Sequence, residues 1–235
     1  AILAYSLFMN TYNLDKTKLV NSVFDKVYKN YDLMNDLMSF GIHRIWKKKL
    51  LAWMRPQPDD KIIDVASGTG DLAKIVSEKN KNKNIISCVE PNQGMLNTGE
   101  KKLKSLKNIK WYSSSAEKLP FKDNSFDIYT ISFGIRNVTD INRCLEEAYR
   151  VLKPGGHFLC LEFSKVENEI LNSFYQKYSK LIPFVGKIIV GDVKPYEYLI
   201  ASIDKFYNQN ELLDLLNKNN FSNVEFRNLS NGISA

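Results

Sequence analysis

The chain has 235 residues, with 33 Lys or Arg against 26 Asp or Glu, so its formal net charge is +7. Hydrophobic residues make up 44% and charged residues 25%, a globular composition that excludes collagen-like, wholly disordered and coiled-coil proteins. No apolar run reaches the roughly 18 residues of a membrane-spanning helix. Three cysteines and two histidines show no metal-binding spacing, so we predict no metal site and a single domain over residues 1–235.

Two helices are predicted before the first strand. Residues 20–31 place apolar and aromatic side chains at helical spacing, and residues 44–54 form a second helical stretch that ends before two prolines. We expect these helices to form an N-terminal cap over residues 18–55.

From residue 60 onward, strand and helix patterns alternate. The predicted strands are 61–66, 84–90, 109–113, 126–133 and 157–163, and the predicted helices between them are 72–80, 95–105 and 140–151. This alternation is typical of a doubly wound α/β sheet, whose strands are mostly parallel. Ligands of such sheets bind at the carboxyl ends of the strands, near the point where the strand order reverses. Residues 60–164 are therefore the predicted cofactor-binding core.

The alternation stops after residue 164. Residues 165–210 combine helical patterns with many tyrosines and form no βα unit, so we predict a helical lid over the substrate. Residues 211–235 predict a helix over 211–219 and a late antiparallel strand over 223–229. We expect the chain to end before the last strands of this region are complete.

A glycine-rich turn, Ser-Gly-Thr-Gly-Asp over residues 67–71, follows the first predicted strand, and the second predicted strand ends in Glu90. The two glycines permit a tight turn and a close approach to a ligand, and an acidic residue after the second strand binds ribose hydroxyls. Asp71 at the start of the next helix disfavours a pyrophosphate and favours a cationic ligand. The pattern indicates a positively charged nucleoside such as S-adenosylmethionine, with an NAD-type cofactor and a purely structural turn as alternatives.

Four longer motifs, over residues 31–46, 116–121, 131–138 and 150–164, carry more information. Together they closely resemble the ubiquinone/menaquinone biosynthesis C-methyltransferases over residues 23–232, and they look most like the mitochondrial ubiquinone branch. The resemblance implies a Rossmann-like class I S-adenosylmethionine-dependent methyltransferase fold. It implies methylation of a ring carbon of a polyprenylated methoxy-benzoquinol, with S-adenosylhomocysteine as the other product.

The resemblance also implies the residues of the site. The cofactor positions are Ala66, Gly68, Thr69, Gly70, Glu90, Met95, Ser115, Ala116 and Ser132. Catalysis is assigned to Arg136 and Asn137, and Tyr31 is expected to close over the cofactor. Because a guanidinium is too basic to accept a proton, Arg136 is expected to stabilise a developing phenolate, while Asn137 orients a water molecule or the second ring hydroxyl.

The biological setting follows from the same resemblance. It implies a polyprenyl benzoquinol substrate, peripheral membrane contact, partners among other ubiquinone-biosynthesis proteins, and a homodimer. It places the protein on the matrix side of the inner mitochondrial membrane, or on the cytoplasmic face of the membrane in a bacterium.

Three hypotheses compete with this interpretation. One is a methyltransferase of another small aromatic or lipid acceptor, and another is a non-catalytic scaffold of the quinone-synthesis assembly. The third is an RNA methyltransferase, suggested only by a pI of about 9.1. We predict no nucleic-acid partner, because the lysines are dispersed or form short clusters and we find no basic groove or RNA-binding module.

Overall fold

The computed structural model describes residues 16–26, 28, 33, 35, 36, 39, 41–166, 173, 178 and 193–235. Residues 16–26 are helical. The elements that follow, in chain order, are α3 (His43–Met54), β1 (Lys61–Val65), α4 (Asp71–Lys79), β2 (Ile85–Val89), α5 (Gln93–Lys102), β3 (Ile109–Tyr112), β4 (Phe126–Ser132), the 3-10 helix η2 (Ile135–Asn137), α6 (Ile141–Val151), β5 (Leu152–Leu161), α8 (Lys194–Lys205) and α9 (Gln209–Lys218).

The five strands form one sheet in the order β3-β2-β1-β4-β5, and every neighbouring pair is parallel. The chain runs outward from β1 to β3 and then returns to place β4 on the other side of β1. The strand order therefore reverses between β1 and β4, and a ligand is expected beyond the carboxyl ends of these two strands.

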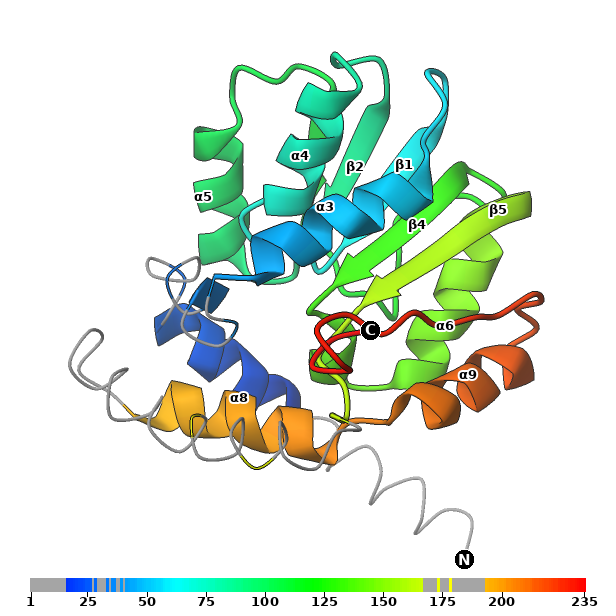
Figure 1. Ribbon diagram of the computed structural model, residues 1–235. Coiled ribbons are helices and arrows are strands. Elements are labelled where there is room, and N and C mark those ends of the chain that lie inside the picture. The colour runs from blue at the N-terminus through cyan, green and yellow to red at the C-terminus, as the bar shows by residue number, and fades with distance from the viewer. Residues whose placement is uncertain are drawn as a thin grey trace, which may run out of the picture.

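Helices cover both faces of the sheet (Figure 1), which explains the almost continuous apolar character of the strands. Successive side chains of a strand point to opposite faces. Ile62 thus packs with Trp46 and Leu50 of α3, whereas Ile63 packs with Leu145 of α6. The two faces carry two separate hydrophobic cores.

The predicted parallel core is confirmed, with one irregularity in β5. The helix predicted over 140–151 ends at Val151 as expected, but β5 already begins at Leu152 and includes the Lys-Pro-Gly-Gly stretch over 153–156. The pairing with β4 jumps from Phe126↔Leu152 to Ile128↔His157, so the residues between bulge out of the ladder. The regular part of β5 therefore begins at His157, where the sequence pattern placed the strand.

The predicted antiparallel strand over residues 223–229 is wrong, because all five strands of the described sheet are parallel. Asn223, Ser230 and Asn231 adopt positive φ, which breaks an extended chain at both ends of the segment. Among the residues that the structure describes, antiparallel contact is limited to isolated bridges of Ser234 with Phe163 and Leu229.

Two predicted regions are only partly described. The predicted helix 20–31 is helical up to residue 26, and most of the rest lies outside the described residues. Within the predicted lid over 165–210, the structure describes residues 165, 166, 173, 178 and 193–210, which include α8 and the first two residues of α9. In the described ranges, no helix has both the length and the apolar character needed to cross a bilayer.

Candidate functional site

The turn between β1 and α4 forms the floor of the site. Ala66, Gly68 and Gly70 all have positive φ, at 52°, 57° and 81°. A Cβ atom on Gly70 would lie 2.7 Å from Leu103 Cδ1 and 2.9 Å from the Trp111 ring. Glycine is therefore required at this position both by the backbone conformation and by the lack of space.

Glu90 follows β2 and is 5% exposed. Its two carboxylate oxygens accept hydrogen bonds from the backbone N–H of Gly68 (2.8 Å) and of Asn92 (2.9 Å). Burial raises the pKa of Glu90 to about 7, and these two hydrogen bonds oppose that effect. Each carboxylate oxygen has a second lone pair, so Glu90 can still accept hydrogen bonds from a ligand.

A large cavity, here called the main cleft, opens beside Glu90. It encloses about 790 Å³, part of it open to solvent. Six of the predicted cofactor residues line it: Ala66, Gly68, Glu90, Met95, Ser115 and Ala116. The helix over residues 16–26 contributes a further wall through Thr17, Val20, Asn21 and Phe24. With residues from the stretch 133–139 after β4, the main cleft gathers residues from five separate stretches of the chain.

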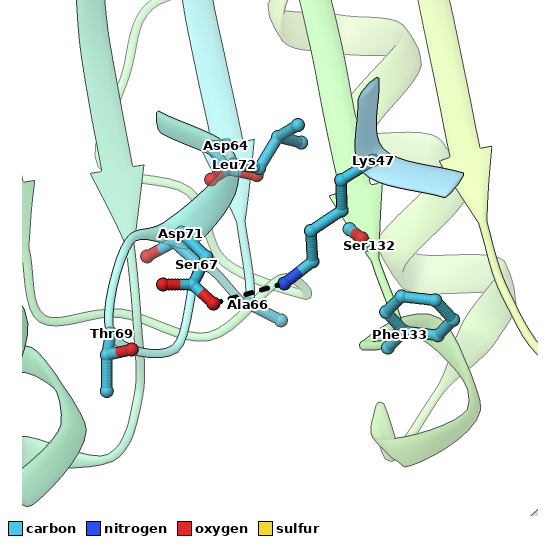
Figure 2. Close-up of a pocket in the computed structure, with 9 residues that line it drawn as sticks. All are labelled: Lys47, Asp64, Ala66, Ser67, Thr69, Asp71, Leu72, Ser132 and Phe133. Carbon is cyan, nitrogen blue, oxygen red and sulfur yellow. Dashed lines mark hydrogen bonds and ion pairs between the residues drawn. The ribbon is translucent and has the colours of Figure 1, made fainter. Parts of the chain in front are cut away.

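A smaller cavity, here called the side cavity, adjoins the main cleft through the shared residues Ala66 and Phe133. It measures about 330 Å³, also partly open, and the predicted residues Thr69 and Ser132 line it (Figure 2). Asp64 Oδ2 and Ser132 Oγ are buried there without a hydrogen-bond partner. Buried polar atoms almost always have partners, so these two oxygens mark a place for a polar ligand.

Lys47 points into the side cavity from α3 (Figure 2) and was not predicted from the sequence. Its side chain is 7% exposed, and its Nζ lies 3.4 Å from Asp71 Oδ2. Lys102 approaches the other oxygen of Asp71 at 2.7 Å. Burial acts to raise the pKa of Asp71, but the two lysines outweigh it and lower the pKa to about 2. One signal was present in the sequence, since Lys47 occupies the same helix face as the apolar Trp46 and Leu50.

The predicted catalytic pair lies in η2, directly after β4. Asn137 lines the main cleft, and its Oδ1 accepts a hydrogen bond from Tyr198 at 3.1 Å. Arg136 has a side chain only 4% exposed and lines neither cavity. Its Nη1 donates to Glu162 and to the Phe133 carbonyl, the latter at 2.9 Å. Arg136 is therefore buried next to Asn137 in the chain and is held by its hydrogen-bond partners outside the linings of both cavities.

Tyr31, a predicted catalytic residue, and His43 both belong to the part of the chain before β1. Tyr31 lies outside the described residues, and its role stays a prediction. His43 is buried, and its Nε2 lies 2.9 Å from Asp36 Oδ1. Burial and the nearby Lys47 lower the pKa of His43. Among the described residues, no group of three or more His, Cys, Asp or Glu side chains could hold a metal ion.

Comparisons with known proteins agree with this geometry. The family model of the ubiE/COQ5 methyltransferase family matches residues 11–235. The ubiquinone/menaquinone biosynthesis C-methyltransferases UbiE of Rickettsia bellii and Brucella abortus are 50% and 48% identical to the chain over 228 and 227 residues. Each match covers 94% of this chain, and 92% and 84% of the respective relatives.

Solved structures identify the fold. A SAM-dependent methyltransferase of Thermotoga maritima has a TM-score of 0.58 and 24% identity, covering 84% of this chain and 79% of its own. A phosphoethanolamine N-methyltransferase of Haemonchus contortus has a TM-score of 0.63 and 15% identity, covering 88% of this chain and 46% of its own. The fold is thus that of the class I S-adenosylmethionine-dependent methyltransferases. With the family model matched over residues 11–235, the chain belongs to the ubiE/COQ5 methyltransferase family.

Proposed function

We propose that the chain is an S-adenosylmethionine-dependent C-methyltransferase that methylates a ring carbon of a polyprenylated methoxy-benzoquinol in ubiquinone biosynthesis. The relatives at 48–50% identity bear the name ubiquinone/menaquinone biosynthesis C-methyltransferase. The observation that carries the proposal is the pair of adjoining cavities. One is lined by Glu90 and apolar groups, the other by Lys47 and buried unpartnered oxygens. S-adenosylmethionine consists of a nucleoside, which suits the first cavity, joined to a zwitterionic amino acid, which suits the second.

The main cleft suits the adenosine half of the cofactor. Glu90 would accept hydrogen bonds from the ribose hydroxyls. Asn92 accepts a hydrogen bond from the Met95 backbone N–H at 3.0 Å, which fixes the first turn of α5 beside the cleft. Met95 would then pack on one face of the adenine, with Ser115 and Ala116 at its edge.

The side cavity suits the methionine half. The Asp64 and Ser132 oxygens, which have no hydrogen-bond partner, would accept hydrogen bonds from an ammonium group. Lys47 would pair with the carboxylate, and Thr69 supplies a further hydroxyl at the same wall. Gly134 lines the main cleft beside Ala66, which lines both cavities, and a Cβ on Gly134 would lie 2.5 Å from Ala66 Cβ. We propose that a glycine here keeps open a passage between the cavities.

When bound, S-adenosylmethionine supplies an electrophilic methyl group on a cationic sulfur. Transfer breaks the sulfur–methyl bond, forms a bond to the ring carbon and releases the ring proton, so the ring reacts best when a neighbouring hydroxyl is ionised. The protein must align the ring, exclude water and stabilise the oxyanion. Asn137 offers a hydrogen-bonding amide at the main cleft, and Arg136, the residue before it, supplies a buried cation. We assign these two residues, with Tyr31, to catalysis.

The setting of the reaction belongs to the same proposal. A polyprenyl tail keeps the substrate in a bilayer, so we propose peripheral contact with the membrane, which the net charge of +7 would favour at anionic lipid. The contact would lie on the matrix side of the inner mitochondrial membrane, or on the cytoplasmic face in a bacterium. Other quinone-synthesis proteins, and a second copy of the chain, are the proposed partners.

A calorimetric titration with S-adenosylmethionine followed by an acceptor panel tests the proposal. We expect binding, and transfer to a reduced methoxy-benzoquinol with a short prenyl tail but not to a sterol. Transfer to the sterol alone would overturn the acceptor assignment. A folded chain that does not bind the cofactor would instead support the scaffold hypothesis.

A further inference from the structure

Two side chains of α8 contact the predicted catalytic pair. Tyr198 donates a hydrogen bond to Asn137 Oδ1 at 3.1 Å, and Ser202 Oγ accepts one from Arg136 Nε at 3.3 Å. Residues four apart on a helix lie on the same face, so α8 presents both groups together to η2. Figure 1 shows α8 on the side of the sheet toward which β4 and β5 point.

The direction of this helix face is determined by the hydrophobic core. Tyr196, Leu199 and Ile203 are 0%, 1% and 7% exposed, and they belong to the same buried cluster as the residues of α3. Their burial fixes the rotation of α8 about its axis. Tyr198 and Ser202 are therefore aimed at η2 by packing that does not involve the catalytic pair.

Each contact orients one side chain of the catalytic pair. The helix η2 has only three residues, so the partners of these side chains must come from other elements. Ser202 Oγ–H donates to the Leu199 carbonyl at 2.7 Å, so its lone pairs face the Arg136 Nε–H. Burial raises the pKa of Tyr198 and the Arg136 charge opposes that shift, so the phenol stays protonated at neutral pH and can donate. Because the Asn137 oxygen accepts this bond, the Asn137 amide N–H groups remain to serve as donors to a ligand.

We propose that Tyr198 and Ser202 are positioning residues that orient Asn137 and Arg136 for methyl transfer. This inference rests on the proposed function, because it takes the Arg136–Asn137 pair as catalytic. Neither residue of α8 lines the main cleft or the side cavity. Their loss should therefore slow turnover while leaving cofactor binding unchanged.

The kinetic test compares Tyr198→Phe and Ser202→Ala with the unaltered chain. Misplacement of a catalytic group by about 1 Å can cost about 10²-fold in rate. We expect kcat to fall about ten- to fiftyfold in Tyr198→Phe and about fivefold in Ser202→Ala. KM for the quinol and Kd for S-adenosylmethionine should stay within about twofold of the values for the unaltered chain.

A rescue variant and two controls complete the kinetic test. Ser202→Thr keeps the hydroxyl and should restore most of the activity. Tyr207→Phe and Ser222→Ala, at exposed positions, are the matched controls.

A double-mutant cycle separates positioning from a general structural effect. If Tyr198 acts through Asn137, Tyr198→Phe should cost little further activity in an Asn137→Ala background. The proposal would be overturned if the losses of activity from the two substitutions were fully additive in free energy, or if Tyr198→Phe alone kept the kcat of the unaltered chain.

A measurement without an acceptor keeps the test independent of the substrate assignment. The side-chain amide signals of Asn137 in a ¹⁵N spectrum can be identified by their loss in Asn137→Asp. We expect them to shift in Tyr198→Phe and to stay in place in Tyr207→Phe. Unmoved signals in Tyr198→Phe would refute the contact even in a chain that methylates no quinol.

Discussion

Three carboxyl groups around the two cavities differ in charge at neutral pH. Burial raises the pKa values of Asp64 and Glu90 to about 7, whereas two lysines lower that of Asp71 to about 2. A carboxyl whose pKa is raised on folding stabilises the fold at low pH, and that contribution is lost as pH rises from its usual pKa toward the raised one. The cofactor-free protein therefore loses stability from Asp64 and Glu90 between about pH 4 and pH 7.

The same titration predicts pH-dependent cofactor binding. Only the ionised Glu90 has all its lone pairs available for the ribose hydroxyls, and ionised Asp64 pairs best with an ammonium group. We expect the Kd for S-adenosylmethionine to fall about tenfold for each of these groups between pH 6 and pH 8. Titration calorimetry at several pH values measures this. Glu90→Gln should bind more weakly and show a shallower dependence, and a flat profile for the unaltered chain would contradict the assignment.

Gly134 allows a test of the passage between the cavities. A Cβ at this position would lie 2.5 Å from Ala66 Cβ, so Gly134→Ala should narrow the passage and weaken S-adenosylmethionine binding at least tenfold. Overpacking of this kind costs about 1–3 kcal/mol of stability, which thermal denaturation reports. Ala66→Gly removes the opposing methyl group, and the double variant should recover affinity. Failure of the double variant to recover would mean that the passage is not where the cofactor crosses.

At the scale of elements, the helix over residues 16–26 closes one side of the main cleft. Lys16 Nζ donates to the Val138 carbonyl at 2.5 Å, and the hydroxyls of Thr17 and Thr139 lie 2.7 Å apart. Near its other end, Asp25 accepts a hydrogen bond from Asn92 Nδ2 at 2.7 Å. Hydrogen bonds thus connect both ends of this helix to the residues that line the main cleft or lie beside it.

The Asp25 contact should control how fast the cofactor leaves. Asn92 also donates its backbone N–H to Glu90, so loss of Asp25 frees both the helix end and a neighbour of Glu90, the proposed ribose-binding residue. We expect Asp25→Ala to raise the dissociation rate of S-adenosylhomocysteine about fivefold, the cost of about 1 kcal/mol for one hydrogen bond. Stopped-flow fluorescence measures the rate, with the exposed Asp214→Ala as control. Equal rates in both variants would show that the helix does not limit release.

The sequence predicts helices, strands and turns well where the hydrophobic periodicity is strong. It predicts side-chain positions poorly where they depend on contacts with distant parts of the chain. Buried strands such as Ile85–Val89 and the turn at Gly68 and Gly70 follow from local residues. Lys47 differs from Lys48 in sequence only by sharing a helix face with Trp46 and Leu50, and which cavity that face borders is decided by packing against distant residues. Likewise, the orientation of Arg136 depends on Glu162 in a distant part of the chain, which no local pattern shows.

At the scale of the whole molecule, Glu162 joins separate parts of the fold. Its side chain, 3% exposed, pairs with Arg136 and accepts the Phe163 backbone N–H at 2.8 Å. Its backbone exchanges hydrogen bonds with Ala235 at 2.9 and 3.0 Å. Burial raises the pKa of Glu162, and the Arg136 charge opposes that shift. Glu162 thus connects η2 and the end of β5 through its carboxylate, and the C-terminal segment through its backbone.

Removing this carboxylate should destabilise the entire domain. Breaking a buried ion pair leaves an uncompensated charge and costs about 3–5 kcal/mol. We expect Glu162→Ala to lower the free energy of unfolding by this amount, as urea denaturation measures. Glu225→Ala, at an exposed ion pair with Arg227, should change it by less than about 1 kcal/mol. Equal effects of the two substitutions would contradict the central role of Glu162.

The most direct test of the central claim is the fate of the methyl group. The purified chain would be incubated with S-adenosylmethionine carrying a ¹³C-labelled methyl group and a reduced methoxy-benzoquinol with a short prenyl tail. Our account predicts a product in which nuclear magnetic resonance places the labelled methyl on a ring carbon. A label found on a ring oxygen, or no transfer by a folded chain that binds the cofactor, would contradict it.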